Sequence, residues 1–236
     1  IVVPAELAFP IPKELPHSVA AGIFMVYGTS YHALVQRANI EKNDEVLVLG
    51  AAGGVGLAAV DIAKSFGARV VAAVSTKEKA EVCAGYGVDD IVVYGEKKLN
   101  KDGQRALTKE LKSKSVRGGY SIIYDPVGDC FAEPALRSIG WGGTYLVVGF
   151  AAGKIPSFPT NLMLLKGCAV SGVFIGRFQK EEPEKNAQNL LEIGRLLAKG
   201  KLNLMVSETI RMEDSVAAIE RIAKRGVVGK VVFVND

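Results

Sequence analysis

Short apolar runs alternate along most of the chain with longer stretches of amphipathic or small residues. Apolar runs of this length predict buried strands, here at residues 45–49, 69–74, 90–94, 120–124, 144–148 and 168–174. The stretches between them predict helices, at residues 53–66, 76–84, 105–112, 130–139 and 184–199. Strands that alternate with helices of this length predict an α/β fold, a doubly wound parallel sheet with helices on both faces.

The two ends of the chain depart from this alternation. Residues 1–17 carry four prolines, which predict an extended strand and a connector. Ser18 is placed to cap a helix over residues 19–27, and a second helix is expected at 31–37. The tail predicts a strand, an amphipathic helix and a last strand, at residues 208–211, 215–224 and 229–234.

Composition and charge narrow the class of protein. Of the 236 residues, 49% are hydrophobic and 23% are charged, which is typical of a globular chain and excludes disorder as the main state. The longest nearly uncharged run, Val46 to Val60, is too short to span a bilayer. A net charge of +4 gives little reason to expect nucleic acid as a partner, whereas a small anionic ligand stays possible.

Three isolated cysteines and two histidines show no metal-ligand spacing. We therefore expect no metal site within this chain and a reducing, intracellular compartment.

The strongest motif follows the first strand of the alternating region. The chain there runs Gly50-Ala-Ala-Gly53-Gly54-Val-Gly56 and then enters a helix. Glycines allow a tight turn and close approach to a pyrophosphate, which the first helical N–H groups then face. Ala51 stands where the G-x-G-x-x-G pattern has its first glycine, while Gly53 and Gly56 keep the other two. The alternative is a tight strand–helix turn without a ligand.

The end of the second strand indicates which dinucleotide is bound. Proteins that bind NAD usually place an acid there to hold the ribose hydroxyls. This strand ends at Ser75 without an acid, and Lys77 and Lys79 follow. A hydroxyl and an ammonium group suit a 2′-phosphate, which favours NADPH over NADH. Solvated lysines on a helix face are the alternative, and the missing acid also argues against a methyltransferase that uses S-adenosylmethionine.

Six segments, taken in order, carry a family resemblance. They are Ala-Gly-Gly-Val-Gly at 52–56, Ser75 with Lys79, Val-Val-Tyr at 92–94, Asp-Pro-Val-Gly at 125–128, the glycine-rich run 142–149, and Gly-Lys-Val-Val at 229–232. Together they resemble the zeta-crystallin-like quinone oxidoreductase branch of the medium-chain dehydrogenase/reductase superfamily. The vertebrate quinone oxidoreductase-like proteins look closest, and the resemblance covers essentially the whole chain.

The resemblance implies a domain plan and an activity. Residues 1–17 would be the last strand and connector of a GroES-like catalytic domain that is otherwise missing. Residues 18–206 would form a Rossmann domain that binds NADP(H), and residues 207–236 would return to the catalytic domain. Members of this branch transfer hydride from NADPH to a quinone or an activated enone without zinc. The catalytic residues are expected largely in the missing domain, and the compartment is either mitochondrial or cytoplasmic.

The resemblance also implies contacts with the cofactor. The expected pyrophosphate and adenosine contacts are Ala52, Gly53, Gly54, Val55, Ser75, Lys79, Tyr94, Val127 and Arg225. The expected nicotinamide contacts are Thr29, Gly149, Phe150, Val173, Phe174 and Ile175. A homodimer that pairs the strand at 168–174 across the sheet edge is expected as well. A catalytically incomplete, NADPH-binding or crystallin-like protein is the alternative function.

Three features are predicted to carry no chemistry. Tyr94 and Lys98 match the Y-x-x-x-K pair of short-chain dehydrogenases, but they follow a strand and lack the glycine motif of that family. His32 is predicted to be structural, and Trp141 is predicted to be a packed side chain.

Overall fold

Six parallel strands form the main sheet of a computed structural model, which describes residues 2, 8, 10, 11, 13, 15–223 and 227–235. Their order across the sheet is β3-β2-β1-β4-β5-β6. The strands are β1 (Glu45–Leu49), β2 (Arg69–Val74), β3 (Asp90–Val93), β4 (Tyr120–Asp125), β5 (Ile139–Val147) and β6 (Ala169–Gly172). This is the strand order of a doubly wound dinucleotide-binding sheet, so the predicted fold class is confirmed.

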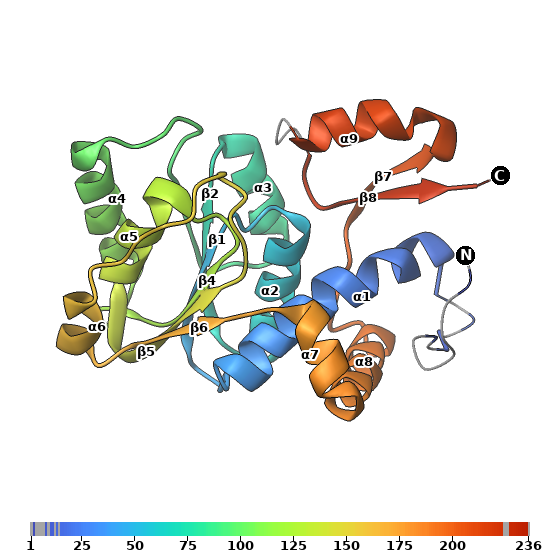
Figure 1. The fold of residues 1–236 in the computed structure, drawn as a ribbon, viewed down its shortest axis with the longest axis horizontal. Helices are drawn as coiled ribbons and strands as arrows, with labels where there is room; N and C mark the ends of the chain where they lie inside the picture. Colours follow the sequence, from blue (N-terminus) through green and yellow to red (C-terminus); the bar gives the residue numbers. More distant parts are fainter. Residues whose placement is uncertain are drawn as a thin grey trace.

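Helices cover both faces of this sheet (Figure 1). One face carries α1 (His17–Tyr31), the π-helix η2 (His32–Arg37), α2 (Gly54–Ser65), α3 (Lys77–Gly85) and α8 (Pro183–Ala198). The other face carries α4 (Lys101–Lys114), α5 (Asp129–Arg137) and α6 (Asn161–Lys166). A short helix, α7 (Ile175–Glu181), follows β6 and contacts α8.

The central strand shows why the sheet needs both layers. All five residues of β1 are buried. Val46 and Val48 pack into the core beneath α1 and α2, whereas Leu47 and Leu49 pack into the core beneath α4 and α5. Because alternate side chains of a strand point to opposite faces, a continuous apolar run requires cover on both.

The first helix is longer than predicted and differs at both ends. It begins at His17 after Pro16, with no side-chain cap, so the capping role predicted for Ser18 is wrong. Proline suits the start of a helix because its fixed backbone angle and missing N–H cost nothing there. The separate second helix is instead a π-helical continuation, because η2 follows α1 without a break. Residues His17–Arg37 are long and apolar enough to cross a membrane. However, 67% of an apolar 18-residue stretch within them is buried inside the protein.

The prediction for Trp141 is also wrong. This side chain is 83% exposed, although it lies on β5 beside the sheet edge. Its ring covers Gly167, where a Cβ atom would lie 3.2 Å from the ring carbons. The ring therefore shields one glycine and leaves most of its surface to solvent.

A small second sheet lies apart from the first. It pairs β7 (Val206–Arg211) with β8 (Lys230–Val234) in parallel, and the short helix η3 (Met212–Asp214) and α9 (Ser215–Ala223) connect the two strands (Figure 1). Just before β8, the N–H of Gly229 donates to the carbonyl of Ala52 at 2.9 Å. The C-terminal segment is thus attached to the main domain at the glycine-rich turn.

Candidate functional site

The glycine-rich turn joins β1 to α2 with almost no spare space. Gly50 has a φ of +57°, and α2 begins at Gly54. A Cβ atom on Gly56 would lie 2.4 Å from the carbonyl oxygen of Gly50, which real structures do not tolerate. Gly56 therefore allows the first turn of α2 to pack on the strand, as expected from the motif. The backbone N–H groups of this first turn have no partner within the helix and can face an anion.

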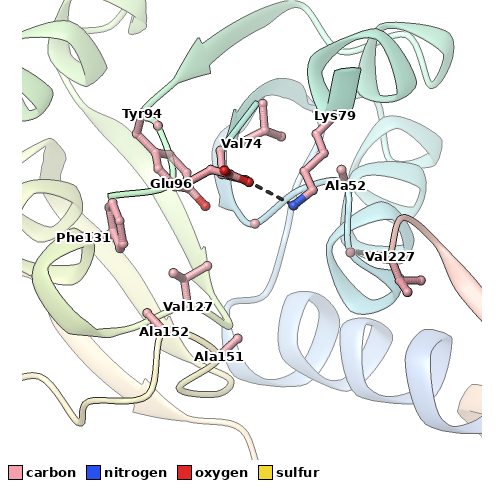
Figure 2. A pocket seen from close by; sticks show the side chains of 14 residues that line it. Ala52, Val74, Lys79, Tyr94, Glu96, Val127, Phe131, Ala151, Ala152 and Val227 are labelled. Carbon is pink, nitrogen blue, oxygen red and sulfur yellow. Dashed lines mark hydrogen bonds between the residues drawn. The ribbon is translucent and has the colours of Figure 1, made fainter. Parts of the chain in front are cut away.

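A cleft of about 420 Å³ opens beside this turn at the carboxyl ends of the strands (Figure 2). The predicted residues that line it are Ala52, Gly53, Ser75, Lys79, Tyr94 and Val127. Lining residues that were not among the predicted cofactor contacts are Gly50, Val74, Gly95, Glu96, Phe131, Ala151, Ala152 and Val227. The lining includes residues that follow β1 and β4, between which the strand order reverses, and open α/β sheets bind their ligands at such a switch point.

A polar pair lies at the end of β2, where NAD-binding proteins carry an acid. The ammonium group of Lys79 donates to the hydroxyl oxygen of Ser75 at 3.2 Å, and Figure 2 shows Lys79 reaching into the cleft. The hydroxyl of Thr76 accepts from the backbone N–H of Lys79 at 3.3 Å and caps α3. The cap positions the first turn of α3, so Lys79 projects toward Ser75.

Tyr94 forms part of the opposite wall. Its N–H donates to the carbonyl of Val74 at 2.9 Å, which continues the β2–β3 pairing by one residue. Its ring packs against Phe131 of α5, with the ring centroids 4.6 Å apart. The backbone contact and the ring contact together hold this aromatic wall in place (Figure 2).

Asp125 supports the floor of the cleft from below. One carboxylate oxygen accepts from the N–H groups of Val127 and Gly128, at 2.7 and 2.9 Å. The other accepts from the hydroxyl of Tyr145, and the Asp125 carbonyl accepts from the N–H of Gly149. Burial raises the pKa of Asp125, against the lowering effect of these hydrogen bonds. One buried residue therefore fixes the loops after β4 and β5, a role that the motif at residues 125–128 does not indicate by itself.

The nicotinamide-end candidates form a second group outside the cleft lining. Gly149 and Phe150 follow β5, and Val173, Phe174 and Ile175 follow β6, so they lie at the same edge of the sheet as the cleft. Val173 and Ile175 are buried, whereas Phe174 is 71% exposed.

The remaining candidates lie on helices or outside the described part of the chain. Thr29 is buried near the end of α1 and donates its hydroxyl proton to the carbonyl of Met25. Gly54 and Val55 form the first turn of α2. Arg225 lies outside the described residues, so its predicted role stays a prediction.

The features predicted to be inert have structural partners. The ammonium group of Lys98 lies 3.1 Å from a carboxylate oxygen of Asp129, so Lys98 is engaged away from Tyr94. His32 is buried and stacks on Phe178 with the ring centroids 3.8 Å apart. Burial lowers the pKa of His32, which agrees with a neutral, packed imidazole.

The residues that build this site match a known protein family. Residues 54–192 match the zinc-binding dehydrogenase family. This range includes the lining residues of the cleft from Val74 to Ala152. The chain belongs to this family. The resemblance to the quinone oxidoreductase-like branch is confirmed by a protein of Nematostella vectensis, the quinone oxidoreductase-like protein 2 homolog, with 33% identity over 234 residues. That match covers 98% of this chain and 62% of the relative.

Two further proteins, one an enzyme by name and one a solved structure, are similar to most of this chain. An acryloyl-coenzyme A reductase of Metallosphaera sedula is 29% identical over 94% of this chain and 60% of its own length. A mycobacterial protein solved in complex with NADPH superimposes with a TM-score of 0.89 at 25% identity, over 99% of this chain and 70% of that one. The chain thus spans somewhat under two thirds of the curated relatives' length.

The family name raises the question of a zinc site. Within the part of the chain that the structure describes, no three His, Cys, Asp or Glu side chains come together in a way that could hold a metal ion. These residues do not fit a zinc centre, so no step of the chemistry is assigned to zinc here.

Proposed function

We propose that this chain binds a nicotinamide dinucleotide in the cleft, with NADPH preferred to NADH. The observation that supports this is the meeting of the glycine-rich turn with the Ser75–Lys79 pair in one cleft at the switch point of the sheet. Phosphates need N–H donors and positive charge, and these two elements supply both. The NADPH bound to the mycobacterial structure supports the same assignment.

Each part of the site has a role in this proposal. The first turn of α2, with Gly54 and Val55, receives the pyrophosphate, while Lys79 and Ser75 receive the 2′-phosphate. Val127 and the Tyr94–Phe131 wall enclose the adenosine. The nicotinamide extends toward the residues that follow β5 and β6, and Thr29 at the end of α1 is assigned to the same end of the cofactor.

When bound, the cofactor supplies hydride, and the protein's contribution is to bind and orient it. We infer that the full-length protein transfers this hydride to a quinone or an activated enone. The names of two relatives, one quinone oxidoreductase-like and one an acryloyl-coenzyme A reductase, support those two acceptor classes. Both acceptors carry a polarised conjugated carbonyl, so one site geometry can serve either, and zinc is not needed for the role proposed here.

Calorimetry tests the cofactor assignment. We expect NADPH to bind the chain more tightly than NADH. Lys79→Met should weaken NADPH binding by about tenfold to a hundredfold, because a charge-assisted contact contributes roughly 1.5–3 kcal/mol. Lys77→Met is the matched control, since Lys77 is exposed on the same helix and does not line the cleft. Equal loss in both variants, or no binding of either nucleotide, would contradict the proposal.

Turnover is tested on the full-length protein. Stopped-flow oxidation of NADPH with ortho-quinones and with alkenals should show consumption with at least one class. NADPH binding without turnover of either class would favour the alternative, a binding or crystallin-like role in which the chain holds the cofactor without catalysis.

The C-terminal segment is proposed to complete a second domain. Among the described residues the sheet of β7 and β8 has two strands, and the connecting η3 and α9 expose four large apolar side chains, Met212, Val216, Ile219 and Ile222. Two strands are too few for an independent sheet, so additional strands are expected to join them. This agrees with the domain plan in which residues 207–236 return to a catalytic domain.

A homodimer through β6 is proposed as the assembly. This edge strand is largely exposed and carries the exposed Val170, and the adjoining β5 and α6 expose Trp141, Leu164 and Leu165. An exposed edge strand with apolar neighbours is a template for pairing with a second copy. Sedimentation should show a dimer at micromolar concentration, and Trp141→Glu should shift it toward monomer.

A further inference from the structure

An acid missing from one strand end is supplied by the next strand. Ser75, the residue that follows β2, is not an acid. Because β3 pairs with β2 in parallel, the residues that follow β3 lie beside those that follow β2. The chain after β3 runs Tyr94-Gly95-Glu96, and all three residues line the same cleft as Ser75. Glu96 thus enters the adenosine end of the cleft from a neighbouring strand.

The cleft carries balanced charge at this end. Among the described residues that line it, Lys79 and Glu96 are the two charged ones. Figure 2 shows both side chains entering the cleft from opposite sides. An ammonium group alone would favour a dianionic phosphate strongly. A carboxylate beside it opposes that phosphate and can accept hydrogen bonds from neutral hydroxyl groups.

The neighbouring contacts keep Glu96 at this place. On one side, Tyr94 is held by its backbone bond to Val74 and by its ring contact with Phe131. On the other side, the N–H of Leu99 donates to the sulfur of Cys130 at 3.3 Å, and Lys98 pairs with Asp129. The short turn between these anchors holds Glu96 at the mouth of the cleft.

We propose that Glu96 determines cofactor selectivity: its carboxylate opposes the 2′-phosphate of NADPH beside Lys79 and accepts a hydrogen bond from the adenosine ribose of NADH. The inference rests on the proposed binding of a nicotinamide dinucleotide in this cleft. Its consequence is that the chain discriminates between NADPH and NADH less than the Ser75–Lys79 pair alone would.

Two substitutions at one position separate the two effects. Glu96→Gln removes the charge but keeps an oxygen acceptor, and Glu96→Ala removes both. We expect Glu96→Gln to tighten NADPH binding by about tenfold. The reason is that the substitution removes the repulsion between the Glu96 carboxylate and the dianionic 2′-phosphate in a partly solvated cleft. NADH binding should stay within about twofold for Glu96→Gln and weaken several-fold for Glu96→Ala, as for the loss of one hydrogen bond.

Calorimetry on the 236-residue chain with NADPH and NADH measures both ratios. Titrations with 2′,5′-ADP and 5′-AMP repeat the comparison without the nicotinamide half. Glu110→Gln, at an exposed position on α4 remote from the cleft lining, controls for the change in net charge. Circular dichroism confirms that each variant is folded.

The outcomes are distinct. A rise in the NADPH-to-NADH affinity ratio in Glu96→Gln, absent from Glu110→Gln, supports the proposal. If the wild type binds NADPH but the ratio in Glu96→Gln stays within twofold of wild type, the selectivity role is overturned and the cofactor site stands. If the wild type binds neither nucleotide, the proposed function fails and the selectivity role fails with it.

Discussion

Tyr145→Phe tests how the floor of the cleft is held. The hydroxyl of Tyr145 donates to one carboxylate oxygen of Asp125, whose other oxygen holds the N–H groups of Val127 and Gly128. Asp125 is 2% exposed, so water cannot replace a lost donor without a rearrangement. Removing one oxygen atom from Tyr145 therefore leaves a buried carboxylate oxygen without its partner, while the ring still fills its place in the core.

The magnitude follows from that lost hydrogen bond. A buried acceptor left unpaired lowers the free energy of unfolding by about 1–3 kcal/mol, and the loss is larger when the acceptor is charged. We expect the free energy of unfolding at pH 7 to fall by about 2 kcal/mol in Tyr145→Phe. For a chain of this size that corresponds to a drop in Tm of about 4–8 °C. NADPH binding should also weaken several-fold, because the loop that carries Val127 loses part of its support.

The pH dependence provides a sharper signature. Burial raises the pKa of Asp125 above 3.8 in the folded state, so the folded chain binds this proton more tightly than the unfolded chain. Between pH 3.8 and the raised pKa, the contribution of Asp125 to stability therefore falls as the pH rises. The bond from Tyr145 favours the carboxylate, so its loss raises the pKa further. The cost of the substitution should be largest at neutral pH and shrink toward pH 4.

Tyr120→Phe is the matched control. Tyr120 is equally buried on the same side of the sheet, but its hydroxyl donates to the neutral carbonyl of Leu111 at 2.8 Å. We expect its loss to cost about 1 kcal/mol at any pH in this range. Urea unfolding followed by circular dichroism at pH 4 to 8 measures both variants. If Tyr145→Phe costs no more than Tyr120→Phe and shows no pH dependence, the account of Asp125 is refuted.

Three further substitutions test the packing of the fold. Gly56→Ala should destabilise the chain by about 1–3 kcal/mol and disturb cofactor binding, because its Cβ would lie 2.4 Å from the carbonyl oxygen of Gly50. Gly194→Ala, inside α8 with open space around it, should instead stabilise the chain by up to about 1 kcal/mol, and equal effects in thermal unfolding would contradict the packing role. Burial against Phe178 lowers the pKa of His32 below 6.5, so the folded chain resists protonation and loses stability as the pH falls below 6.5. His32→Gln should flatten that part of the stability profile, and an unchanged profile would show that another group controls it.

Much of the fold could be predicted because its strands are buried on both faces. The limits of β1 and β2 were predicted to the residue, since each begins with a charged residue and continues as an apolar run that ends before a glycine or a serine. The helices α6 and α7 were not predicted, because six or seven residues carry too little periodicity to distinguish a helix from a loop. The early start of β5 was missed for a similar reason, since glycines at 140, 142 and 143 indicate a turn rather than a strand.

Some residues of the candidate site could likewise be predicted from the sequence, and others could not. Ala52 and Gly53 in the cleft lining, and the absence of an acid at Ser75, belong to local motifs and could be located from spacing alone. Glu96 could not, because its relation to Lys79 depends on which strand pairs with β2. The support from Tyr145 to Asp125 also joins two strands, and nothing within either strand indicates it.

By itself, the sequence determined the buried strands, most of the helices between them and the kind of ligand that the glycine-rich turn can receive. Both depend on residues within one turn or one strand, where backbone freedom and side-chain periodicity act over a few positions. The tertiary structure alone decided which strand ends meet. It placed Glu96 opposite Lys79, the Tyr145 hydroxyl against Asp125, and Gly229 against Ala52. Strand order sets the charge and rigidity of the cleft, and it arises from packing of the whole sheet rather than from any segment of it.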